Sequence, residues 1–99
     1  MEATERGTGG VLRGDLEISL GVIMRLSPDE VFAALGRHVR GDRGDLPEED
    51  WEEKKLSLAG GFELFSAYLA NDGTEFWIMT KEDQSLTTVL LPKESRTMM

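Results

Sequence analysis

The sequence predicts an α+β fold in which one strand and two helices precede a three-stranded antiparallel meander that packs on the helices. The first supporting observation is an alternation of apolar and polar residues after Asp15, which is the period of a strand. The second is a pair of helix-start signals, at Ser27 and at Asp45. The third is the segment Phe62–Glu94, where turn-forming residues separate three apolar runs.

Length and composition place these elements in a single domain. The chain has 99 residues, which suits one domain with a modest core. Residues 1–14 are rich in glycine and poor in apolar residues, so we expect a flexible N-terminal segment. We expect the α+β domain to span residues 15–94 and the tail, residues 95–99, to be frayed.

The first strand is expected within Leu16–Leu26. Leu16, Ile18 and Leu20 alternate with polar residues, as in a strand with one buried face. Gly21 indicates a bend or a bulge. The sequence therefore predicts a strand or an extended approach to the core over this whole segment.

The first helix has the clearest local signal in the chain. Ser27 and Glu30 have the spacing of a capping box, in which each side chain accepts a hydrogen bond from the backbone N–H of the other residue. Pro28 suits the first helical position, and Gly41 is placed to end the helix. The expected apolar face consists of Val31, Phe32, Leu35 and Val39.

A second helix is expected to follow. Asp45 and Glu48 have the spacing of another capping box, with Pro47 in the first turn. Gly60-Gly61 is expected to end this helix. One side of the helix carries Trp51, Lys55, Leu58 and Ala59.

The meander is predicted as strands Phe62–Ala70, Thr74–Thr80 and Leu86–Leu91. Asn71–Gly73 tolerates positive φ and predicts a hairpin, and Lys81–Ser85 is a polar turn. Both faces of the meander carry large apolar residues, which leaves one face short of cover and indicates a partner or a homodimer. The alternative is that the first strand and the N-terminal segment cover that face.

The charge balance limits the partners of the protein. Nineteen Asp and Glu residues against 11 Lys and Arg give a formal net charge of −8, which disfavours direct binding to nucleic acid. This charge fits a protein partner with a basic surface. The absence of Cys excludes disulfides, and we expect no metal and no cofactor because no ligand pattern is present. Without a long apolar run or a signal-peptide pattern, we expect no membrane association and a cytoplasmic location.

One group of residues could support acid–base chemistry on a phosphodiester. His38 could move a proton, and Arg37 and Arg40 could stabilise the developing charge. The predicted sheet offers hydroxyl groups at Ser66, Tyr68, Thr80, Thr87 and Thr88. The alternative is structural, because cationic side chains in the last turn complement the helix dipole and Asp42 and Asp45 suit a turn and a cap.

An acidic run lies at the start of the second helix. Its members are Glu48, Glu49, Asp50, Glu52 and Glu53. These carboxylates could imitate a row of phosphates or dock on a basic protein surface. The alternative is a solvated helix face, with acids favourably placed near the helix N-terminus. Trp51, inside the run, is either a core anchor or an exposed interface anchor, and its spacing to Leu58 favours the core.

The segment from Leu35 to Pro92 resembles a known family in several blocks. The blocks are Arg37-His38, Gly41-Asp42-x-Gly44-Asp45-Leu46, Glu49-Asp50, Ser66-Ala67-Tyr68, Asp72-Gly73-Thr74, Trp77-Ile78-Met79-Thr80, Asp83 and Ser85-x-Thr87-Thr88-Val89-Leu90-Leu91-Pro92. The family consists of small bacterial proteins of plasmids and other mobile elements, sometimes labelled as related to type I restriction systems. The chain departs from the family at Arg43, where Trp is usual, at Gln84, where Arg is usual, and at Glu53-Lys54, where Asn is expected. These departures favour a binding role over a nuclease activity.

Charge, patterning and resemblance together predict a small acidic, non-enzymatic interaction protein of a mobile element. It would inhibit or modulate a host nucleic-acid-handling defence system by binding a nuclease or another subunit of a restriction or CRISPR effector. The acidic run and Trp51 would contact that partner. One alternative is a toxin-like ribonuclease that uses His38, and a second is an oligomeric structural protein.

Overall fold

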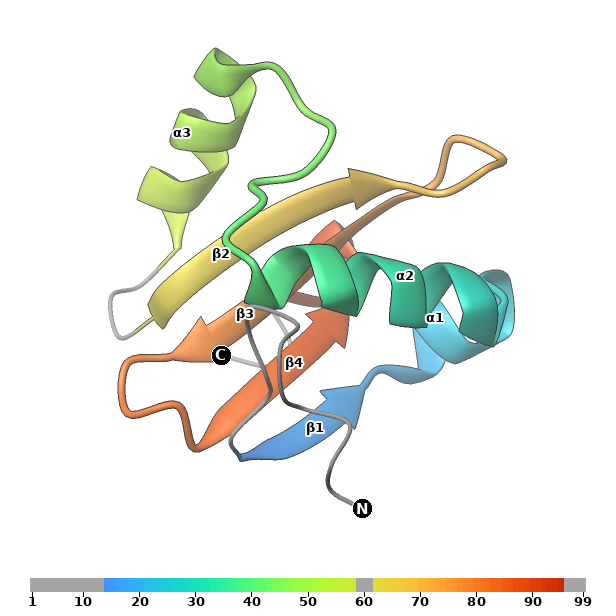
Figure 1. Cartoon of the computed structure of the whole chain (residues 1–99). Helices are drawn as coiled ribbons and strands as arrows, with labels where there is room; N and C mark the ends of the chain where they lie inside the picture. The colour runs from blue at the N-terminus through green and yellow to red at the C-terminus, as the bar shows by residue number, and fades with distance from the viewer. Residues whose placement is uncertain (1–13, 59–61, 96–99) are drawn as a thin grey trace.

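The computed structural model describes residues 14–58 and 62–95, and it shows the α+β fold that the sequence predicts (Figure 1). The elements in chain order are β1 (Asp15–Ile18), α1 (Leu20–Arg25), α2 (Pro28–Val39), α3 (Glu48–Ser57), β2 (Phe62–Leu69), β3 (Glu75–Lys81), β4 (Leu86–Leu90) and the short 3₁₀ helix η2 (Pro92–Glu94). The predicted flexible segment and tail lie outside the described residues, apart from Gly14 and Ser95.

The four strands form one sheet in the order β1-β4-β3-β2. The meander is confirmed, because β2 and β3 pair antiparallel, as do β3 and β4. The hairpin turn at Asn71–Gly73 is also present, with Gly73 at a φ of +91°. β1 pairs with β4 in the parallel direction and forms the outer edge of the sheet. Among the described residues, no helix is long and apolar enough to cross a membrane.

The first face of the sheet packs against α1 and α2 (Figure 1). This core consists of Val22, Leu26, Val31, Ala34, Leu35, Tyr68, Phe76, Ile78, Val89 and Leu91. Strand register explains the composition, because Val89 pairs with Ile78 and paired residues point to the same face. Burial of these side chains is the main stabilising contribution to the fold.

The second face carries a separate apolar cluster. It consists of Trp51, Phe65, Ala67, Trp77, Met79 and Leu90, all buried, with Leu46, Leu58 and Phe62 packed against them. Since Trp51 belongs to α3, this helix contributes cover to the second face. The expectation that the first strand covers that face is wrong, because β1 extends the sheet as its edge strand.

The segment Leu20–Arg25 is a helix, which corrects the predicted strand. The Ser19 hydroxyl caps the helix by accepting a hydrogen bond from the Val22 N–H at 3.2 Å. The Glu94 carboxylate also accepts from the Gly21 N–H at 3.1 Å and from the Ser19 hydroxyl at 2.6 Å. These bonds to a distant carboxylate favour the helical turn over an extended chain.

The start and end of α2 are as predicted. The Ser27 hydroxyl accepts from the Glu30 N–H at 3.2 Å, Pro28 is the first helical residue, and Gly41 follows the helix with a φ of +88°. The Glu30 carboxylate, however, accepts from the backbone N–H of Asn71 instead of the Ser27 N–H. Phe32, placed on the apolar face by its spacing, is 61% exposed.

The prediction of a second capping box, at Asp45 and Glu48, is wrong. Pro47 occupies the N-cap position of α3, which has no side-chain cap. The Asp45 carboxylate instead accepts from the Leu69 N–H at 2.9 Å and pairs with Arg37. Asp45 is therefore a link between β2 and α2. The predicted helix end at Gly60-Gly61 and the side chain of Ala59 lie outside the described residues.

Candidate functional site

His38, the candidate catalytic residue, is part of the protein interior. Its side chain projects from the last turn of α2 toward the sheet, and the residue is 1% exposed. Nδ1 lies 2.7 Å from the Ser66 hydroxyl, and Nε2 lies 2.8 Å from the Thr80 hydroxyl. Both ring nitrogens are therefore already hydrogen-bonded within the protein.

The hydroxyl groups around the His38 ring determine which ring nitrogen donates a hydrogen bond and which accepts one. Ser66 donates its single proton to the Asp42 carbonyl at 2.9 Å, so it accepts at its oxygen from Nδ1–H of His38. Nε2 then accepts from the hydroxyl of Thr80. Because that proton is used, the Thr87 hydroxyl donates to Thr80 across 2.8 Å. The geometry assigns His38 as the neutral Nδ1–H tautomer.

The pKa of His38 agrees with this neutral state. Burial lowers it from 6.5 to about 4, because the interior disfavours the charged ring. A hollow of about 190 Å³ between the end of α2, α3 and β2 reaches the ring, with Arg43, Trp51 and Lys55 also lining it. The ring nitrogens are not open toward that hollow, since both are engaged with hydroxyls.

The other residues of the predicted acid–base group separate into three places. Tyr68 and Thr80 lie near His38, and the Tyr68 hydroxyl donates to the Asp42 carbonyl at 3.0 Å. Arg40 is exposed just after α2. Thr88 pairs with Met79 and points to the second face of the sheet, away from His38. The structure therefore does not assemble the whole predicted set.

Arg37 is held by carboxylates. Its guanidinium donates to Asp42 at 2.8 Å and to Asp45 at 2.9 Å, and it lies 4.8 Å from the centre of the Tyr68 ring. The hydrogen bond from Arg37, together with one from the Gly44 N–H, lowers the pKa of Asp42. These contacts fix the loop after α2, whose backbone pairs with β2 through Gly44 and Ala67.

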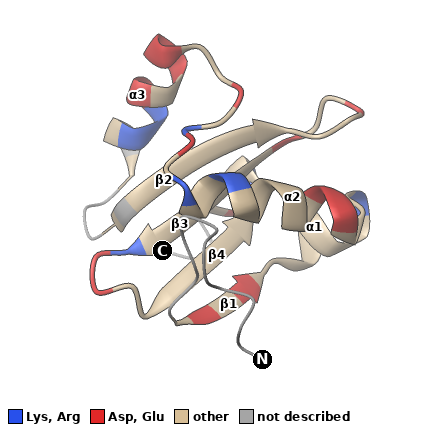
Figure 2. Cartoon of the chain, viewed as in Figure 1, with Lys and Arg blue, Asp and Glu red and all other residues tan. Residues whose placement is uncertain are grey.

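The acidic run occupies the N-terminal half of α3, and cationic residues occupy its C-terminal half (Figure 2). The five carboxylate residues are exposed: Glu48, Glu49, Asp50, Glu52 and Glu53. One contact of this run is an ion pair between Glu48 and Arg43 at 3.6 Å, where both side chains are largely exposed. An exposed pair of this kind contributes little to stability.

Trp51 anchors α3 to the sheet, as its spacing predicts. It is 8% exposed, and its indole N–H donates to the Phe65 carbonyl at 2.9 Å. The centre of its ring lies 4.5 Å from the guanidinium carbon of Arg43 and 5.1 Å from the ammonium nitrogen of Lys55. Trp51 therefore attaches α3 to the sheet, and two cationic side chains pack over its ring.

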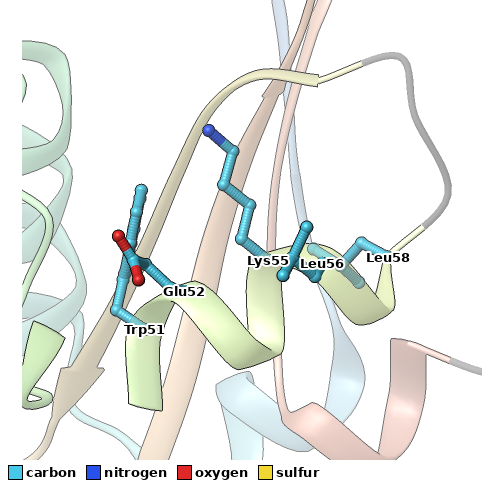
Figure 3. Close-up of a pocket in the computed structure, with 5 residues that line it drawn as sticks. All are labelled: Trp51, Glu52, Lys55, Leu56 and Leu58. Atoms are coloured by element: carbon cyan, nitrogen blue, oxygen red, sulfur yellow. The ribbon is translucent and has the colours of Figure 1, made fainter. Parts of the chain in front are cut away.

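A hollow of about 450 Å³ lies along the same helix (Figure 3). It is lined by Trp51, Glu52, Lys55, Leu56 and Leu58. The side chains of Trp51 and Lys55 rise from one side of α3, and the two leucines lie at its C-terminal end (Figure 3). Leu56 is 84% exposed, so an apolar side chain stands beside carboxylates and a cation.

Sequence reasoning missed the parts of this surface that depend on tertiary contacts. The sequence offered only a weak signal that Leu56 is exposed: it lies outside the side of the helix that carries Trp51, Lys55 and Leu58. Arg43 carried none, since its position over the Trp51 ring depends on the loop between the helices. Glu94, which accepts from Ser19, Gly21 and Leu91, was also missed because its partners are distant.

The described residues contain no group of three or more acidic or histidine side chains that could hold a metal ion. In comparisons with known proteins, the chain matches no family model, no curated protein and no solved structure. A functional interpretation therefore depends on the geometry described above.

Proposed function

We propose that the protein is a non-enzymatic binding protein that docks α3 onto the basic surface of a protein partner. The observation that carries the proposal is the exposed acidic face of α3 on a helix held in place by the buried Trp51. A fixed helix loses little conformational entropy when it binds, which favours affinity. The exposed Leu56 and the hollow beside it add an apolar contact within the charged surface.

The partner class that we propose is a subunit of a host defence nuclease of the restriction or CRISPR type. Such enzymes bind nucleic acid, and a surface that contacts phosphates is rich in lysine and arginine. A row of carboxylates on a rigid helix is complementary to a surface of that kind. The resemblance to mobile-element proteins supports the same choice, because a mobile element benefits from blocking host defence.

An assay of restriction in cells tests this proposal. Cells that carry a type I restriction system would be challenged with unmodified phage while they express the protein, and a CRISPR system would be assayed in parallel. We expect the protein to raise phage survival against at least one of these systems. Purified effector should then bind the protein with an affinity that falls as salt rises, since screening weakens the attraction. No protection in either system and no binding would refute the proposal.

A matched pair of variants locates the interaction on α3. The charge reversal of Glu48, Glu49, Glu52 and Glu53 to lysine should abolish protection, because the partner would face like charges. The control reverses Asp29 and Glu82, which are exposed and lie outside α3 and β1. It lowers the net negative charge without changing α3, and it should retain most of the activity. Equal activity of both variants would exclude the acidic face of α3 as the binding site.

A further inference from the structure

A second exposed surface lies at the opposite end of the molecule from α3 (Figure 1). Seven large apolar side chains are exposed in the described part of the chain, and five of them fall within Leu16–Phe32. These five are Leu16, Leu20, Ile23, Met24 and Phe32, with exposed fractions of 36% to 75%. Apolar side chains gathered in this way are typical of an interaction site.

The outer edge of β1 is part of this surface. The N–H groups of Asp15 and Ser19 donate to carbonyls of Ser85 and Val89 at the β4 side. In a strand, alternate residues direct their backbone groups to opposite edges, so Leu16 and Ile18 direct theirs away from β4. Because β1 is the terminal strand of the sheet, these groups have no strand beside them in the described chain. An edge of this kind is a template for pairing with another strand.

The side chains around this edge define what a paired strand would contain. Ile18 points toward α1 and lines an apolar hollow of about 130 Å³, which Ile23 and Phe32 also line. Asp15 and Glu17 point to the other face, because side chains alternate along a strand. A complementary strand therefore has apolar residues toward α1 and basic residues toward Asp15 and Glu17.

We propose that β1 accepts an extended segment of a partner protein as a fifth strand, one with alternating apolar and basic side chains. Main-chain hydrogen bonds to Leu16 and Ile18 supply the pairing, and an apolar side chain enters the hollow beside Ile23. A second copy of this chain is disfavoured as the occupant. Antiparallel pairing of two β1 strands would bring Asp15 and Glu17 close to their own copies, in a protein whose net charge is −8.

A synthetic peptide of alternating lysine and valine is the probe. We expect it to shift the amide resonances of Leu16 and Ile18 and to slow their hydrogen exchange at physiological ionic strength. A peptide of the same sequence, N-methylated at every backbone nitrogen so that neither edge can pair, keeps its charge. It should bind at least about tenfold more weakly, because it cannot form the main-chain hydrogen bonds.

Two protein variants locate the site. Leu16→Pro removes an outward N–H while retaining the bonds of β1 to β4, and it should weaken binding of the parent peptide about tenfold. Leu56→Lys, a control on α3, should bind as the parent protein does. Equal binding of both peptides, or resonance shifts confined to α3, would overturn the proposal and indicate non-specific charge attraction. A dimer through β1 in analytical ultracentrifugation would overturn it in favour of a second copy.

Discussion

The helices α2 and α3 both pack on the sheet, yet the protein holds them in different ways. α2 buries Val31, Ala34, Leu35 and His38, and a serine hydroxyl caps its start. α3 has no side-chain cap, and Trp51 is its buried residue among those described. α2 is therefore part of the core, while α3 is anchored mainly by Trp51 and keeps its acidic side chains exposed.

Removal of Trp51 is expected to give the largest effect. Trp51→Ala should lower the free energy of unfolding by about 4 kcal/mol, because it removes a buried aromatic ring and the indole hydrogen bond. Hydrogen exchange should also show that α3 loses protection more than α2. Urea denaturation measures the first effect. Leu56→Ala, at an exposed position on the same helix, is the control, and a similar loss in both variants would contradict a single anchor.

The stability of the protein is expected to fall in acid because His38 is buried at the end of α2. In the folded protein the pKa of His38 is about 4, against 6.5 as its ordinary value. The unfolded chain therefore binds a proton first as the pH falls, and stability decreases between pH 6.5 and about 4. The expected decrease from His38 is about 3 kcal/mol. His38→Gln, which does not titrate, should remove most of this slope, and an unchanged slope would contradict the neutral buried ring.

The cap of α2 is expected to give a smaller effect. Ser27→Ala removes the hydroxyl that accepts from the Glu30 N–H and should cost about 1 kcal/mol of stability. Ser27→Asp retains an acceptor and should restore the loss. Thermal denaturation compares the two variants. If alanine and aspartate behave alike, the start of α2 does not depend on its cap.

Charge reversal on α3 is expected to change stability least. A single substitution of Glu52 or Glu53 by lysine replaces an exposed side chain beyond the first turn of α3, where the helix dipole acts weakly. Each such substitution should change the free energy of unfolding by no more than about 0.5 kcal/mol. Circular dichroism and urea denaturation check this. A large loss of stability would mean that these carboxylates support the fold, which would weaken the distinction between the two helices.

The elements that the sequence predicted well are those with local causes. Ser27, Pro28 and Gly41 define α2 through contacts within a few residues, and Asn71–Gly73 defines its hairpin in the same way. The helix α1 was missed because its start depends on Glu94, which is 73 positions from Gly21. The parallel pairing of β1 with β4 was missed because the two strands are far apart in the sequence.

The candidate site likewise has features that follow from the local sequence and features that depend on distant contacts. The burial of Trp51 and the exposure of its acidic neighbours follow from helical spacing, and the structure agrees. The environment of His38 does not follow from its neighbours in sequence, because Ser66, Thr80 and Thr87 come from three different strands. Burial and hydrogen bonding of this kind arise only when the sheet is assembled.

One comparison tests most directly whether function resides on α3 and not at His38. The parent protein, the α3 charge-reversal variant and His38→Gln would be assayed side by side for phage survival and for cleavage of RNA by purified protein. We predict protection by the parent and by His38→Gln, no protection by the α3 variant, and intact RNA in every case. RNA cleavage that disappears in His38→Gln, with the α3 variant unaffected, would contradict this account.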